Sequence, residues 1–133
     1  MFVPSLAGQV LAPSGAGLVV AEWTAAGATS DEPLYQAPPH RHLDEDEAWY
    51  VLQGVLRVRL DDDVVEVPAG GAVMAPRGTV HTFWNPRPEP VRYLLVMGAR
   101  THRLIQSIHA RADAYEPGVM RQLFEEHGAQ LLD

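Results

Sequence analysis

The sequence predicts an all-β fold, a single small antiparallel barrel, from three features. Prolines and glycines, eleven of each, interrupt the chain about every 8–15 residues. The stretches between them are short and rich in Val, Leu, Trp and Tyr, as in barrels and sandwiches. The chain has 133 residues and is 47% hydrophobic, which suits one domain with a sizeable core. No apolar run approaches the roughly 20 residues needed to cross a bilayer.

Each expected strand ends at a turn. Gly54 joins two strands tightly, and the acidic run 61–63 closes the next hairpin. Two further turns, at 68–71 and 76–78, contain glycine, which can adopt positive φ. The strands are expected at 18–24, 47–53, 55–60, 64–67, 72–75, 80–84 and 91–97.

The remaining segments lie outside the strands. Three prolines exclude 85–90 from a central strand, because proline donates no ladder hydrogen bond, so this is a loop at one end of the barrel. Residues 119–127 predict a short helix, with Pro117 in its first turn and Gly128 at its end. We therefore divide the single domain 1–133 into an N-terminal arm (1–17), a barrel (18–98) and a C-terminal helical extension (99–133).

Composition excludes several kinds of chemistry. The chain has no cysteine, which removes disulfides, thiolate ligands and cysteine nucleophiles. All ten basic residues are arginine, so a lysine Schiff base is impossible. The formal charge of −7 argues against nucleic acid as a partner. Residues 1–18 include no basic residue, so we expect no secretory signal and a cytoplasmic protein. Because no apolar run is long enough to span a bilayer, we also expect no membrane partner.

Chemistry is concentrated at the segment 39–47. In an extended strand, His40 and His42 project from the same face, and a short acidic turn lets Glu47 begin the next strand facing them. His81, at the start of a later strand, can add a third imidazole. Such ligands suit Fe, Mn, Ni, Cu, Co or Zn. On these residues alone, ordinary surface histidines and a solvated acidic turn remain the alternative.

Two spaced motifs resemble those of the cupin superfamily. The first is His-x-His, four residues, Glu, six residues and Gly, here from His40 to Gly54. The second is Gly, five residues, Pro-x-Gly, two residues, His, three residues and Asn, here from Gly70 to Asn85. The resemblance covers about 36–97, and it departs from the family at Leu34, where glycine is common.

This resemblance implies a cupin-type barrel, also called a double-stranded β-helix or jelly roll, with a short C-terminal helix. It also implies a divalent transition metal held by His40, His42, Glu47 and His81. The other histidines lie outside the motifs, and we expect them at the surface; they are His102, His109 and His127.

Strand alternation predicts the pocket around this metal. If Glu47 faces inward, Trp49 and Gln53 do as well, and inward His81 implies inward Phe83 and Asn85. These four residues form the expected substrate pocket, with Gln53 as a polar group beside the ligands. Trp49 and Phe83 as ordinary barrel core is the alternative interpretation.

Three functional classes follow from such a site. The first is a dioxygenase resembling the quercetinase-like cupins, in which Glu47 acts as the base toward an enolic or phenolic substrate. The second is a non-oxidative isomerase, cyclase or decarboxylase, and the third is a non-catalytic module that binds a small molecule. The apolar arm 1–18 is long for a free tail, so we also expect a homodimer.

Overall fold

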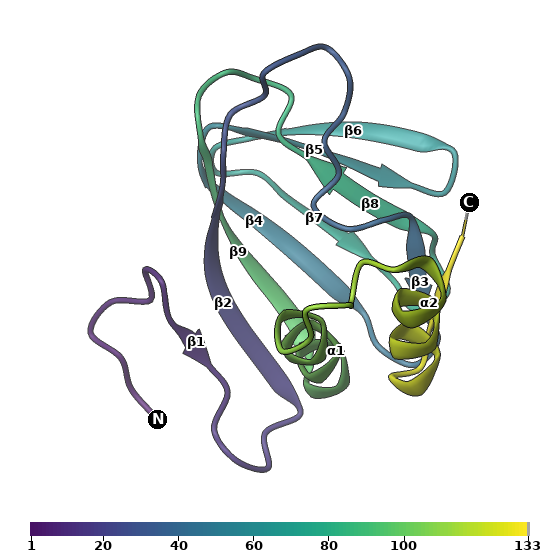
Figure 1. Ribbon diagram of the computed structural model, residues 1–133. Coiled ribbons are helices and arrows are strands. Elements are labelled where there is room, and N and C mark those ends of the chain that lie inside the picture. Colours follow the sequence, from purple (N-terminus) through teal and green to yellow (C-terminus); the bar gives the residue numbers. More distant parts are fainter. Residues whose placement is uncertain (133) are drawn as a thin grey trace.

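The computed structural model describes residues 1–132. Within that range the chain forms two five-stranded antiparallel sheets, which face each other as a flattened barrel (Figure 1). One sheet has the order β1 (Val10–Leu11), β2 (Leu18–Ala25), β9 (Val91–Gly98), β4 (Glu47–Gln53) and β7 (Ala72–Ala75). The other has the order β10 (Ala129–Leu131), β3 (His40–His42), β8 (His81–Trp84), β5 (Val55–Leu60) and β6 (Asp63–Pro68).

The fold class is confirmed, and all seven expected strands are present with ends within one residue of prediction. They form because inward and outward side chains alternate, as on β9, where every second residue from Val91 to Met97 is buried. The inward residues of the two sheets form one core, in which Trp49, Val51, Leu56 and Val58 are wholly buried. This core supports the strands that carry the histidines.

Two helices follow the barrel, and they lie together at one end of it (Figure 1). Helix α2 (Pro117–Glu126) matches the expected helix and has Pro117 in its first turn. Helix α1 (Ala99–His109) was not predicted, although Leu104, Ile105 and Ile108 have the spacing of one helical face. A small second core holds both helices to the barrel and includes Leu104, Leu123 and Phe124.

The ends of the chain add strands that the sequence did not predict. The arm forms β1, which pairs with β2 of the same chain, with Val10 opposite Ala21. After α2 the chain returns to the barrel as β10, which pairs with β3, so that Leu131 lies opposite His40. No helix within residues 1–132 is long and apolar enough to cross a membrane.

Candidate metal centre

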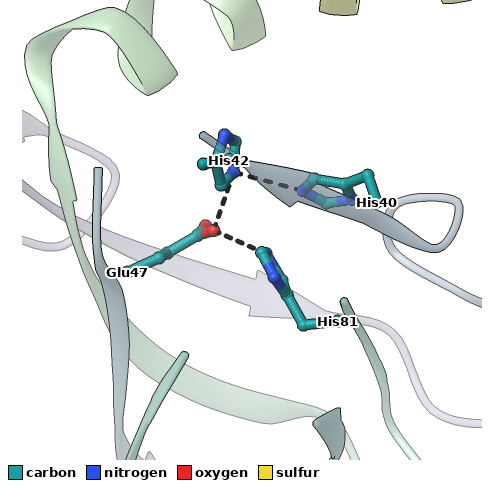
Figure 2. Close-up of side chains that lie close together, drawn as sticks. All are labelled: His40, His42, Glu47 and His81. Carbon is teal, nitrogen blue, oxygen red and sulfur yellow. Dashed lines mark hydrogen bonds and ion pairs between the residues drawn. The ribbon is translucent and has the colours of Figure 1, made fainter. Parts of the chain in front are cut away.

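Short strands bring the three histidines and Glu47 together inside the barrel (Figure 2). His40 and His42 are the first and last residues of β3 and both point inward, as expected for alternate positions. His81 begins β8 directly opposite His40. Glu47 begins β4 in the other sheet, so the cluster of four side chains lies between the two sheets. All four are at most 5% exposed.

The donor atoms of these side chains converge on one point. One ligand atom from each residue lies within 4.8 Å of all the others. Glu47 Oε2 is 3.1 Å from His42 Nε2 and 2.9 Å from His81 Nε2. His40 Nε2 lies 3.2 Å from His42 Nε2 (Figure 2).

The outer nitrogens of two rings show which tautomer is present. The Nδ1–H of His40 donates to the carbonyl oxygen of Pro38 at 2.7 Å, and that of His81 donates to the carbonyl oxygen of Thr79 at 3.0 Å. Because a carbonyl only accepts, each Nδ1 carries a proton, and each ring in its neutral form turns an Nε2 lone pair inward. Inward lone pairs beside a carboxylate repel one another unless a cation lies between them. The donor set therefore fits a divalent metal.

The electrostatics of these side chains also favour a cation. Burial opposes ionisation of Glu47, but hydrogen bonds from His42 and His81 outweigh it and hold the pKa of this carboxyl well below its usual range. Burial and the neighbouring His81 lower the pKa of His40 to about 3. Burial also lowers the pKa of His81, but the hydrogen bond to Glu47 raises it more, and the net shift is upward. The site keeps a carboxylate and a neutral His40 ready to bind a cation.

A cavity of about 300 Å³ opens onto this cluster of side chains. His40, His42 and Glu47 form part of its wall, and the predicted pocket residue Phe83 lines it as well. Much of the remaining wall is apolar and comes from the two helices: Leu104, Ile105, Ile108, Met120 and Phe124. The Phe124 ring also packs edge-on against His40, with centroids 5.1 Å apart.

The other predicted pocket residues lie elsewhere. Trp49 faces inward as expected, but it is wholly buried in the core behind the site, with its ring 5.5 Å from that of His81. Gln53 was expected inward and is exposed, because an irregularity in the pairing of β4 with β9 between Val51 and Gln53 changes the facing of the strand end.

Asn85 is buried, but its side chain forms hydrogen bonds with backbone groups. Its Nδ2 donates to the carbonyl oxygens of Ala26 at 3.2 Å and Glu89 at 2.7 Å, and its Oδ1 accepts from the backbone N–H of Arg87 at 3.0 Å. These bonds hold the 85–90 loop against the end of β2. Asn85 therefore lies outside the cavity wall and shapes the loops at that end of the barrel.

Sequence reasoning missed the cavity residues contributed by β9 and α1. Tyr93 was assigned to a strand without a role, yet alternation along β9 turns it inward, and it lines the cavity. Thr101, in the first turn of α1, also lines it. His109 is exposed, as expected of a surface histidine, and stands at the cavity rim, whereas His102 and His127 are partly buried. The helical spacing of apolar residues in 99–109 was the sequence signal that could have predicted this part of the cavity wall.

Comparison with known proteins agrees with the fold and the site. The family model of the cupin domain matches residues 29–97, which is more than half of the chain and includes all four residues of the candidate metal site. The chain therefore belongs to the cupin family. A search of the curated proteins found no match.

Solved structures share the barrel at low sequence identity. A conserved protein with a double-stranded β-helix domain from Klebsiella pneumoniae is 24% identical, with a TM-score of 0.55 over 68% of this chain and 69% of that one. KdgF from Halomonas sp. is 22% identical, with a TM-score of 0.53 over 68% and 74%. A putative sugar phosphate isomerase from Acidithiobacillus ferrooxidans is 20% identical, with a TM-score of 0.55 over 64% and 52%, so the match spans about half of that protein. At these identities the likeness concerns the fold.

Proposed function

We propose that this cupin is a metal-dependent enzyme of the dioxygenase type, acting on a small enolic or phenolic molecule. The observation that carries the proposal is the apolar cavity that opens directly onto the ligand cluster. Its volume of about 300 Å³ is at the lower end for small-molecule sites. A flat, mostly apolar molecule with one ionisable oxygen suits such a space.

The charge balance supports an anionic oxygen as the group that enters. A divalent metal held by His40, His42, Glu47 and His81 would supply Lewis acidity and open positions for a substrate oxygen and O₂. With a single carboxylate among the ligands, the site retains a net positive charge. That charge favours an enolate or phenolate over a neutral alcohol.

Two polar groups of the chain support this chemistry at the cavity. Within the described residues Glu47 Oε1 makes no hydrogen bond, and we assign it to accept the hydroxyl proton of the substrate. Tyr93 lines the cavity, and no described residue bonds to its hydroxyl. Burial and the charge of Glu47 raise the pKa of Tyr93, so it stays a phenol and can donate a hydrogen bond to the bound oxyanion.

A non-oxidative isomerase is the second candidate, because one relative of the same fold is described as a putative sugar phosphate isomerase. A sugar phosphate needs cationic groups around its phosphate. No arginine is found among the described residues of the cavity wall, and the sequence contains no lysine. The cavity therefore favours the apolar enolic substrate.

The experiment is to purify the protein aerobically, identify bound metals by elemental analysis, and reconstitute the metal-free protein with each first-row divalent ion. Oxygen uptake is then followed with flavonols, catechols and β-diketones. We expect uptake with one of these classes and its loss in His42→Ala. Arg57→Ala is the matched control, since this exposed side chain pairs with Glu66 away from the site.

The three functional classes separate in this experiment. Oxygen uptake that requires the four ligands supports the proposal. Turnover that proceeds equally without O₂ overturns it in favour of a non-oxidative enzyme. Tight binding of a small molecule without turnover by any reconstituted form overturns it in favour of a binding module.

We also propose that the protein is a homodimer. Phe2 is 85% exposed on the arm, and exposed Leu18, Tyr50 and Met74 lie on the sheet that the arm joins. A second copy would cover these apolar side chains. Light scattering coupled to size-exclusion chromatography should give twice the chain mass, and Phe2→Asp should weaken the dimer. A monomer at micromolar concentration would contradict this proposal.

A further inference from the structure

The carboxylate of Glu45 binds the beginning of helix α1. Its Oε2 accepts the backbone N–H of Arg100 at 3.2 Å, and its Oε1 accepts the backbone N–H of Thr101 at 2.7 Å. These N–H groups lie in the first turn of the helix, where backbone N–H groups have no hydrogen-bond partner within the helix. Gly98 leaves room for this contact, because a Cβ there would overlap the carboxylate. The acidic turn after β3 thus holds the start of α1 against the barrel.

The same carboxylate sets the direction of the Thr101 hydroxyl. Thr101 Oγ1 lies 2.8 Å from Glu45 Oε1, and because an ionised carboxylate only accepts, the hydroxyl donates its single proton to it. The hydroxyl oxygen is then left as an acceptor. Thr101 is 2% exposed, so little water can reach this oxygen.

The atom that faces this oxygen is Nδ1 of His42, at 3.4 Å. The contact is long, but it requires His42 to carry a proton on Nδ1. Nε2, which lies 3.1 Å from Glu47 Oε2, is then the ring atom that can bind a metal. His40 and His81 reach the same state through backbone carbonyls two residues earlier. Among residues 1–132, Thr101 is the partner that His42 Nδ1 has in place of such a carbonyl.

We propose that Glu45 and Thr101 are positioning residues that fix the tautomer and ring orientation of His42 for metal binding. The inference rests on the proposed metal site and adds Glu45, at a position that the first motif leaves unspecified, and Thr101, which lies outside both motifs. It also ties helix α1 to the metal centre, since Thr101 belongs to the helix that supplies Leu104 and Ile105 to the cavity wall. Removing a partner of this kind costs about 10- to 100-fold in metal affinity.

The test is the dissociation constant for Co²⁺, measured on metal-free protein by competition with a chromophoric chelator. Thr101→Val keeps the shape and removes the hydroxyl, and we expect binding about 10- to 100-fold weaker with an altered visible spectrum of bound Co²⁺. Thr101→Ser keeps the hydroxyl and should stay within a few-fold of the unmodified chain. Ser107→Ala is the matched control, because this α1 hydroxyl faces His127 and touches no ligand.

The outcomes distinguish the inference from the proposed function. If the unmodified chain binds no Co²⁺, the metal site itself fails. If it binds Co²⁺ and Thr101→Val binds equally well, the positioning role is wrong while the site stands. Equal loss in Thr101→Ser and Thr101→Val would also overturn it, since Thr101→Ser keeps the hydroxyl and its loss would show that the hydroxyl does not maintain metal binding. Should Thr101→Val fail to fold, Glu45→Gln tests the same chain of contacts and should weaken Co²⁺ binding with the Thr101 side chain intact.

Discussion

Metal addition should raise the melting temperature of this protein by an amount that depends on Glu47. A ligand that binds only the folded state stabilises it by RT ln(1 + [L]/Kd), which is about 2.7 kcal/mol at a free metal concentration of about 100 Kd. Unfolding entropy is about 2.1 cal/mol/K per residue, or about 0.28 kcal/mol/K for 133 residues. The expected rise for the unmodified chain is therefore about 10 °C.

Glu47→Gln should lose most of this rise. The substitution keeps the side-chain volume but removes the carboxylate that lies within 3.1 Å of both His42 Nε2 and His81 Nε2. Glu47 is a proposed direct ligand, so its removal should cost at least as much as removing an outer partner, and we take the upper end of that range, about 100-fold in affinity. At the same free metal concentration the stabilisation falls to about 0.4 kcal/mol, and the melting temperature rises by only about 1.5 °C.

Scanning calorimetry on chelator-stripped protein, with and without metal, measures both shifts. Glu66→Gln is the matched control, because this half-exposed carboxylate on β6 pairs with Arg57 on β5 and should leave the 10 °C rise intact. If no first-row divalent ion changes the melting temperature of the unmodified chain, the metal site is refuted. An equal rise in Glu47→Gln would show that the ion binds elsewhere.

Three further predictions follow from the same geometry. Tyr93→Phe should weaken binding of a catechol or flavonol about 2- to 10-fold, the worth of one hydrogen bond, in a fluorescence titration; unchanged affinity would remove Tyr93 from the site. Metal affinity should fall as pH is lowered from about 8 to about 6, because metal binds neutral imidazole and the raised pKa of His81 lets a proton compete already above 6.5. Chelator competition across that range measures this, and a flat profile would contradict it. Asn85→Ala should lower the free energy of unfolding by at least about 2 kcal/mol, because it leaves two carbonyl oxygens and one N–H without their hydrogen-bond partner. An unchanged urea midpoint would show that Asn85 does not hold the 85–90 loop in place.

The placement of Gln53 shows where local reasoning ends. Alternation from Glu47 correctly predicts inward Trp49, and Val51 follows the same alternation, because successive side chains on a regular strand point to opposite faces. Past Val51 the pairing with β9 becomes irregular, and Gln53 points outward. A register change depends on the neighbouring strand, which is some 40 residues away in the chain, so no pattern within β4 reports it.

The sequence by itself determined the barrel and the four residues of the candidate metal site. Strand periodicity and turn residues are local signals, and the two motifs keep His40, His42, Glu47 and His81 at spacings that neighbouring strands convert into one site. Only the tertiary structure decided what surrounds that site. The cavity wall and the Glu45–Thr101 contact to His42 come from helices that pack across the barrel end, and such packing depends on shape complementarity between segments far apart in the chain.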